Sequence, residues 1–363
     1  MRRRLLLLGM GMGVLGWLVG CGPSGEGGKE SNTTPKPGEP NATASKPLKV
    51  GLVMDEAGID DRSFNAAAYR GLQRGIAELG IDKEKARYIE SKTNADYKTN
   101  LTQLATQGYD VVVAVGFAML DPLKEIAPQF PNTKFAIVDS DAPEGAPNCV
   151  GLKFKEEQGT FLAGYLAASM SKSNKIGFVG GMKIPLIEKF EIGYRAGAKA
   201  ANPNTQVLVT YTNTWNDLSK GKSQAEQLFG NGADIIFHAS GKCGLGVIAA
   251  AKEKGPGFYA IGVDSDQDEV APGRVLTSMI KRVDNAVFDV IQKVKEGKFT
   301  TGSIVYDITQ KGIGLSERKF TKQDIPAKVT QRLEELEKAL ASGKIVAPDT
   351  ADALAKFQAP KLD

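Results

Sequence analysis

The chain has few of the residues from which metal centres and nucleophilic active sites are usually built. Its 363 residues include three cysteines and one histidine. Neither Cys149 nor Cys243 stands at a metal-ligand spacing from another such residue. His238 lies in or just after an apolar run, with no serine or cysteine nucleophile at a recognisable elbow. We therefore expect no metal ion, no cofactor and no enzymatic activity.

A strong charge of either sign is also missing. The chain carries 46 Lys and Arg against 42 Asp and Glu. Three of the basic residues, Arg2–Arg4, lie at the very start, and without them the balance is 43 against 42, a net charge of +1. No basic stripe remains that would attract a phosphate backbone, so we expect no nucleic acid as partner.

Long apolar runs are confined to the first residues, which have the form of a lipoprotein signal peptide. Basic Arg2–Arg4 precede the apolar run Leu5–Leu15, which is too short to span a membrane comfortably. Residues 18–21 (LVGC) match the pattern cut by the lipoprotein signal peptidase, which implies that 1–20 are removed and Cys21 is lipidated. An uncleaved membrane anchor is the alternative. Residues 21–47, rich in Gly, Pro, Ser, Thr and Lys, are then a disordered tether.

From residue 48 the chain alternates apolar runs with helical patterns, which is typical of parallel sheets covered on both faces. The second half also repeats the first. Residues 49–53 (KVGLV) are echoed by 175–179 (KIGFV), and 134–141 (KFAIVDSD) by 258–266 (FYAIGVDSD). The repeat predicts two similar α/β lobes, each with a doubly wound parallel sheet.

We place the N-terminal lobe at 48–172, with a return helix at about 281–298. The C-terminal lobe covers 174–278 and about 300–363. Several chain crossings between lobes make a hinge rather than a flexible linker, as in the fold of a type I periplasmic binding protein, which closes around its ligand.

A polar loop, residues 55–65 (DEAGIDDRSFN), separates the first predicted strand from a helical pattern. Such a loop lies at the carboxyl edge of a parallel sheet, where open α/β folds bind their ligands. Phe64 would be exposed there unless it contacts a ligand. The alternative is that Phe64 packs the helix entry against the sheet while Asp60 or Asp61 caps the helix.

This loop resembles the signature of the basic membrane protein family of bacterial lipoproteins, the purine nucleoside receptors that serve ABC transporters. The Asp, Gly, Asp-Asp and Ser-Phe-Asn positions all fall in register, and the resemblance covers most of the chain after the tether. It implies a lipid-anchored, extracytoplasmic receptor at the cell membrane, on the periplasmic side in a Gram-negative cell. It also implies a purine nucleoside ligand, an ABC permease as partner and a monomeric chain.

The candidate ligand-binding residues come from loops that face one another across the two lobes. They are Asp55, Ser63, Phe64, Asn65, Phe117 and Asp139 from the first lobe, Trp215, Gly241 and Asp264 from the second, and Lys281 at the crossing. Two aromatic side chains from opposite lobes can sandwich a flat base. We assign this role to Phe64 and Trp215. At the position of Trp215 the family usually has another aromatic such as Phe. Ordinary packing is the alternative for Trp215 and for Phe117.

By the resemblance, Asp264 and Lys281 hold the ribose hydroxyls with help from the backbone at Gly241. Asp139 or Asn65 would read the edge of the base, and Asp55 would contact sugar or base. A carboxylate facing a vicinal diol accepts two charge-assisted hydrogen bonds, which favours a nucleoside. Because the nominated charges are mainly aspartates, a nucleotide phosphate would be repelled.

Three other interpretations stay open. Residues 244–249 (GLGVIA) with Asp264 imitate a dinucleotide fingerprint and its ribose-binding acid, although the glycines fall inside the predicted helix. The same fold could instead bind another small ligand such as a sugar. It could also belong to a signalling or adhesin lipoprotein that faces a protein partner.

Overall fold

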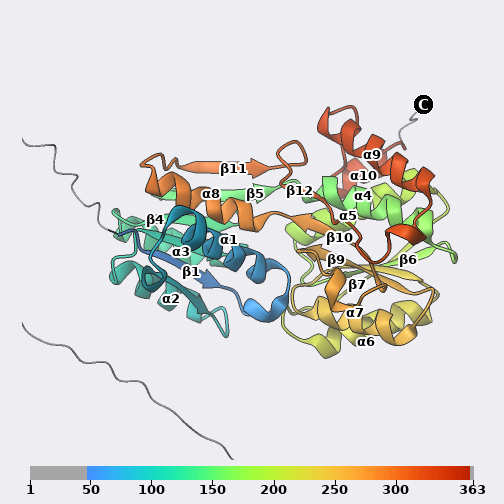
Figure 1. Ribbon diagram of the computed structural model, residues 1–363, viewed down its shortest axis with the longest axis horizontal. Coiled ribbons are helices and arrows are strands. Elements are labelled where there is room, and N and C mark those ends of the chain that lie inside the picture. The colour runs from blue at the N-terminus through green and yellow to red at the C-terminus, as the bar shows by residue number, and fades with distance from the viewer. Residues whose placement is uncertain (1–46, 360–363) are drawn as a thin grey trace, which may run out of the picture. The chain divides into compact units, whose positions relative to one another are not determined.

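The computed structural model describes residues 47–359 (Figure 1). The predicted signal peptide, Cys21 and all but the last residue of the predicted tether lie outside this range. Within it, no helix has both the length and the apolar character needed to cross a membrane.

The first lobe is built on a six-stranded sheet in which all neighbours are parallel. Its strand order is β11-β5-β4-β3-β1-β2. The strands are β1 (Val50–Met54), β2 (Ala86–Glu90), β3 (Val111–Val115), β4 (Lys134–Val138), β5 (Cys149–Phe154) and β11 (Gly302–Tyr306). Because β1 and β3 are buried on both faces, their sequences are unbroken apolar runs.

The second lobe repeats this plan in a sheet of order β12-β10-β9-β8-β6-β7. Its strands are β6 (Lys175–Gly180), β7 (Gln206–Tyr211), β8 (Ile235–Ala239), β9 (Tyr259–Asp264), β10 (Val275–Lys281) and β12 (Ile313–Leu315). The order β4-β3-β1-β2 in the first sheet corresponds to β9-β8-β6-β7 here, as the internal repeat predicts. Only the pairing of β12 with β10 is antiparallel in the sheets described.

Helices cover both faces of each sheet, and neighbouring residues of a strand point to opposite cores. Val113 belongs to the core under α1 and α8, whereas Val112 belongs to the core under α2 and α3. In the second lobe, α4 and α5 cover one face and α6 and α7 the other. The helices are α1 (Phe64–Leu79), α2 (Asp96–Thr106), α3 (Leu120–Ile126), α4 (Glu156–Met170), α5 (Pro185–Ala201), α6 (Leu218–Gly230), α7 (Cys243–Lys254), α8 (Val283–Lys295), α9 (Ala327–Ala341) and α10 (Ala351–Lys356).

Helices α4 and α5 approach unusually closely because each presents a glycine to the other. A Cβ at Gly164 would lie 1.9 Å from the carbonyl oxygen of Tyr194, and one at Gly197 would lie 1.8 Å from that of Phe161. No larger residue fits either position without moving the backbone of the partner helix.

The chain crosses between the lobes three times, after β5, after β10 and after β11. These crossings differ from the expected boundaries at two places. Helix α4 (Glu156–Met170) packs on α5 and β10, so it covers the second sheet although 48–172 was assigned to the N-terminal lobe. Strand β11 pairs with β5 in the first sheet, although about 300–363 was assigned to the C-terminal lobe. Periodicity identifies a strand or helix but does not say which of two similar sheets it joins.

The expected fold class is nevertheless confirmed: two doubly wound α/β lobes joined by several crossings, the type I periplasmic binding fold. Helix α8 returns to the first lobe and lies along α1 (Figure 1).

Candidate functional site

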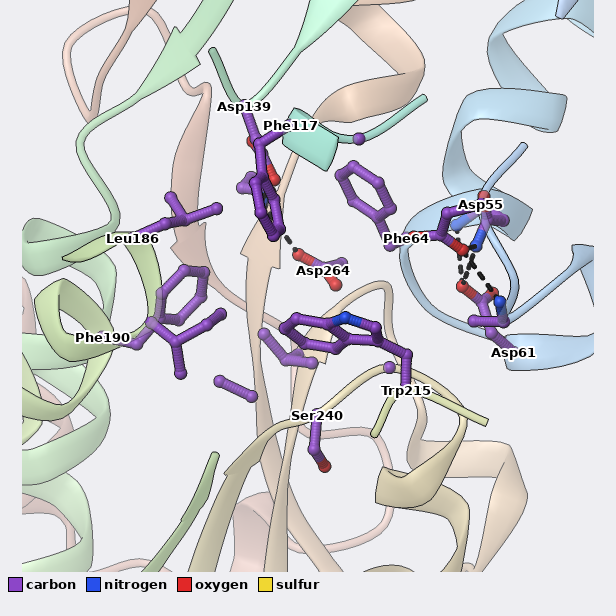
Figure 2. A pocket seen from close by; sticks show the side chains of 18 residues that line it. Asp55, Asp61, Phe64, Phe117, Asp139, Leu186, Phe190, Trp215, Ser240 and Asp264 are labelled. Atoms are coloured by element: carbon purple, nitrogen blue, oxygen red, sulfur yellow. Dashed lines mark hydrogen bonds and ion pairs between the residues drawn. The ribbon is translucent and has the colours of Figure 1, made fainter. Parts of the chain in front are cut away.

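A pocket lies between the lobes, where strands of both sheets end (Figure 2). The space that atoms leave empty there, counted with its open mouth, is about 540 Å³. Nine of the ten residues predicted to bind ligand line it. They are Asp55, Phe64, Asn65, Phe117, Asp139, Trp215, Gly241, Asp264 and Lys281.

The polar loop 55–65 is held in shape by Asp61, a lining residue that was considered only as a helix cap. Its buried carboxylate accepts backbone hydrogen bonds from Ser63 (2.8 Å), Asn65 (2.8 Å) and Ala66 (3.1 Å). Asp61 therefore caps the start of α1, which leaves Phe64 in the first turn, where it lines the pocket. Burial raises the pKa of Asp61 to about 6, against the effect of these hydrogen bonds.

Asn65 joins Asp61 to Asp55 at one end of the pocket. Its Nδ2 donates to Asp55 Oδ1 at 2.7 Å and to Asp61 Oδ2 at 3.1 Å. Burial raises the pKa of Asp55 to about 7 even though the Asn65 hydrogen bond opposes the shift. Asn65 Oδ1 is buried and has no hydrogen-bond partner among the described residues. This end of the pocket, which we call the polar end, therefore has an acceptor free and a carboxyl group close to half-protonation at neutral pH.

Three aromatic rings enclose the middle of the pocket. Phe64 and Phe117 lie on one side and Trp215 on the other (Figure 2). The Phe117 and Trp215 rings meet edge to face, with centroids 6.4 Å apart. Trp215 is seated over Gly181, where a Cβ would lie 2.1 Å from the indole ring. Phe117 and Trp215 both line the pocket, and Trp215 also packs against the main hydrophobic core.

A buried charge cluster surrounds Lys281, the last residue of β10 and not the start of a helix as expected. Its Nζ lies 2.7 Å from Asp139 Oδ2, 3.6 Å from Asp264 Oδ1 and 3.9 Å from Glu156 Oε1. Burial alone would lower the pKa of Lys281, but the three carboxylates outweigh it and raise the pKa. Lys281 is therefore charged at neutral pH. Its ammonium joins the carboxylate of Asp139 in the first lobe, that of Asp264 in the second lobe and that of Glu156 in α4.

Asp139 and Asp264 occupy equivalent positions in the two repeats. Asp139 directly follows β4 and Asp264 is the last residue of β9. Each has a left-handed backbone, with φ of 65° and 62°, which residues other than glycine rarely adopt. Burial raises the pKa of Asp264, against the effect of Lys281. Oδ1 of each aspartate is buried and accepts no hydrogen bond from any described residue. Two carboxylate oxygens beside the pocket, one from each lobe, thus lack a hydrogen-bond donor among the described residues, although Asp264 Oδ1 lies 3.6 Å from the Lys281 ammonium.

Ser63 was predicted to touch the ligand, and the structure instead places it behind the pocket, fully buried between the lobes. Its Oγ lies 2.8 Å from Asp264 Oδ2 and 3.0 Å from the Val263 carbonyl oxygen, and either oxygen can accept a hydrogen bond from the Ser63 hydroxyl. Ser265 Oγ donates to the Ser63 carbonyl at 2.7 Å, and Arg70 Nη2 donates to Ser265 Oγ at 2.8 Å. We call this set the interlobe bonds, because they join the start of α1 to the end of β9.

Three further lining residues, Leu186, Ile187 and Phe190, were missed by the sequence analysis. They belong to the first turns of α5, which follows β6, the first strand of the second repeat. The counterpart of this position in the first repeat is the loop 55–65, so the repeat itself contained the signal.

The remaining sequence motifs have structural roles. Gly244 lies inside α7, where a Cβ would come within 1.9 Å of the His238 ring, so this glycine makes room for an imidazole instead of a pyrophosphate. His238 is buried, its Nε2 lies 2.9 Å from Gln267 Oε1, and burial lowers its pKa to about 4. Cys149 and Cys243 are buried free thiols. Across residues 47–359 no group of His, Cys, Asp and Glu side chains could hold a metal ion.

Comparison with known proteins agrees with this fold. A family model described as "Bmp: ABC transporter substrate-binding protein PnrA-like" matches residues 48–350. The chain is 37% identical over 371 residues to a CD4+ T-cell-stimulating antigen of Listeria innocua, covering 96% of this chain and 99% of that protein. It is 33% identical to the ABC transporter nucleoside-binding protein BmpA of Lactococcus lactis, covering 83% of this chain and 89% of that one. A solved ABC transporter solute-binding protein from Aeropyrum pernix matches with a TM-score of 0.78 and 28% identity, covering 85% of this chain and 96% of that one.

Proposed function

Because the chain belongs to the Bmp family of ABC transporter substrate-binding proteins, we propose that it binds a purine nucleoside between its lobes and delivers it to an ABC permease. The observation that carries this proposal is the pairing of aromatic faces with carboxylate oxygens that accept no hydrogen bond from the described residues. Phe64 and Trp215 lie on opposite sides of the pocket, and Oδ1 of Asp139 and Oδ1 of Asp264 are the two oxygens.

In the proposed complex the base lies between Phe64 and Trp215, with its edge toward Asp55 and Asn65. Stacking contributes about 1–3 kcal/mol per aromatic face. The buried Asn65 Oδ1 accepts from the base, and a protonated Asp55 can donate to it. The edge of a purine carries both donors and acceptors, so this end suits a base better than an aliphatic group.

The ribose diol lies against Asp264, with Lys281 and the backbone at Gly241 beside it. Each hydroxyl that donates to a carboxylate contributes about 1.5–3 kcal/mol. Two stacked faces and about four such bonds are sufficient for the roughly 8 kcal/mol of a micromolar complex together with the cost of closing the lobes.

A nucleoside fits better than a nucleotide. Among the described residues that line the pocket, Lys281 is the only lysine or arginine, and Asp139 already bonds to it at 2.7 Å. Four lining residues are aspartates: Asp55, Asp61, Asp139 and Asp264. A phosphate would lose its water without gaining a free cation.

The proposal includes the membrane anchor. The basic, apolar and LVGC pattern of residues 1–21 supports cleavage before Cys21 and lipidation of that residue. The receptor is then a monomer held at the outer face of the cytoplasmic membrane or in the periplasm, and it binds its ligand without turnover.

Calorimetric titration of the chain from Lys46 onward, which contains both sheets and their cores, tests the proposal. Adenosine, guanosine and inosine should each bind one to one, uridine, adenine and ribose more weakly, and the recovered ligand should be unchanged. Phe64→Ala and Asp264→Ala should each weaken binding about tenfold or more, and Phe320→Ala, a partly exposed aromatic outside the pocket, is the matched control. Binding of a free sugar alone, or of no small molecule, would overturn the proposal in favour of a sugar receptor or a protein-facing lipoprotein.

A further inference from the structure

The end of the pocket opposite the polar end is apolar. Leu186, Ile187 and Phe190 line it, and the last two are almost completely buried. Leu186 and Phe190 lie on one side of the pocket and Asp55 on the other, with Asp264 between them (Figure 2). We call these three side chains the apolar wall.

The apolar wall follows from the way α5 begins. Pro185 is the first residue of the helix, and positions 186, 187 and 190 then fall on one face of its first turns. The Lys281 ammonium lies 5.4 Å from the centroid of the Phe190 ring, but it is already paired with Asp139 at 2.7 Å. The other nearby cations are held elsewhere. The Lys189 ammonium bonds to Glu156 at 2.6 Å and to the Phe154 carbonyl oxygen at 2.9 Å, and Lys183 lines a separate groove next to α10.

The geometry of a ribonucleoside connects these two ends. In the ribose ring the base and the 5′ carbon are attached to the two carbons that flank the diol. If the base edge meets the polar end and the diol meets Asp264 in the middle, the 5′ carbon must point toward Leu186 and Phe190. A hydroxyl there would lose water and meet mainly hydrocarbon, whereas an apolar group would be favoured.

Resting on the proposed function, we infer that the preferred substrate class is purine ribonucleosides with a small apolar group at the 5′ position, such as 5′-alkylthio nucleosides. Replacing the 5′ hydroxyl by a methylthio group buries about two methylene-sized groups against the apolar wall. This should tighten binding about tenfold.

Titration with four ligands that share adenine and the diol tests the inference. Relative to adenosine, 5′-deoxyadenosine should bind about equally or more tightly, 5′-methylthioadenosine about tenfold more tightly, and adenosine 5′-monophosphate about a hundredfold more weakly. In Leu186→Asn the preference for 5′-methylthioadenosine over adenosine should shrink to about one. Leu218→Asn, which changes a leucine that is 41% exposed and outside the pocket, should leave the tenfold ratio intact.

The outcomes separate the inference from the proposed function. If adenosine binds but 5′-methylthioadenosine binds more weakly, the apolar wall leaves no room beyond C5′, and the inference fails while the receptor function stands. If adenosine 5′-monophosphate binds as tightly as adenosine, the 5′ carbon faces solvent and the assumed orientation is wrong. If none of the four ligands binds, both the inference and the proposed function are refuted.

Discussion

Replacing Lys281 by methionine should destabilise the protein more than any exchange of a surface lysine. Methionine keeps most of the length of the side chain but removes the charge that three buried carboxylates share. Removing one partner of a buried ion pair typically costs about 3–5 kcal/mol, because the other charge stays buried without compensation.

The structure indicates how this cost is distributed. Glu156 would keep Lys189 at 2.6 Å, and Asp264 would keep Ser63 at 2.8 Å. Asp139 would lose the ammonium bonded to its Oδ2, while its Oδ1 has no hydrogen-bond partner in the described chain. One carboxylate thus loses its main partner and two lose part of theirs, so we expect Lys281→Met to lower the free energy of unfolding by about 4 kcal/mol at pH 8.

The deficit should also depend on pH. Burial already raises the pKa values of Glu156 and Asp264, and Lys281 opposes both shifts. Without the ammonium these pKa values rise further, so the folded variant holds protons that the unfolded chain releases. Its stability is then lost as pH rises through the folded pKa values and regained as pH falls. We expect the deficit to be clearly smaller at pH 5 than at pH 8, and Asp139→Asn added to Lys281→Met to recover part of it.

Urea unfolding at both pH values measures these effects without ligand. Lys98→Met is the matched control, because Lys98 pairs with Glu125 at the surface and their side chains are 56% and 58% exposed; its cost should be about 0–1 kcal/mol at either pH. A loss below about 1 kcal/mol for Lys281→Met, or one that is the same at pH 5 and pH 8, would show that the carboxylates do not need this cation.

Three other predictions concern residues behind or beside the pocket. Ser265→Ala removes the hydrogen bond to the Ser63 carbonyl without touching the pocket lining. It should weaken nucleoside binding about five- to tenfold, because the two lobes open more easily, and should increase the ligand-dependent contraction of the protein in small-angle scattering. An unchanged affinity would show that this bond has no part in closure of the lobes. Asp55 should stabilise the folded state more at pH 5 than at pH 8, because burial raises its pKa to about 7 and the folded state binds the extra proton. In urea unfolding, the stability of the wild type relative to Asp55→Asn should therefore increase as the pH falls from 8 to 5, and a difference that does not change with pH would contradict the assignment. Gly181→Ala should displace Trp215 and weaken nucleoside binding about tenfold at nearly unchanged stability. Trp215 is the only tryptophan in the chain from Lys46 onward, so its fluorescence reports the displacement. An unaltered emission spectrum together with full affinity would exclude the displacement.

The elements that sequence analysis predicted well are those decided by local pattern. Strands β1, β3, β4 and β9 are apolar runs that end at an Asp or a Gly, and a parallel sheet forces such ends to one edge. Asp55, Phe64, Asp139 and Asp264 therefore line the pocket as expected. Trp215 follows β7 and was nominated as an aromatic side chain opposite Phe64, and it also lines the pocket.

Local pattern does not predict which of the two sheets a segment joins, or whether a side chain points into the pocket or toward the other lobe. Ser63 and Phe64 are neighbours, yet one faces the second lobe and the other faces the pocket, and only the path of the Asp61-capped turn decides between them. Lys281 was expected to open a helix, but it ends β10, where it pairs with Ile313 of β12, and local pattern does not reveal that pairing. The carboxylates of Asp139 and Glu156 that surround its side chain are also more than a hundred positions away. The placement of β11 depends on pairing with β5, which no local pattern encodes.

Asp264 connects ligand recognition with closure through its two oxygens. Oδ2 lies 2.8 Å from Ser63 Oγ in the other lobe, and Oδ1 faces Lys281 at 3.6 Å with no hydrogen-bond donor of its own in the described chain. A sugar hydroxyl can therefore bond to Oδ1 without displacing the interlobe bond at Oδ2. A ligand can shift the equilibrium between open and closed lobes only if it binds the closed state more tightly than the open one. The carboxylate of Asp139 can supply this difference. Asp139 belongs to the other lobe, so a ligand that contacts both Oδ1 atoms makes its full set of bonds only when the lobes are closed.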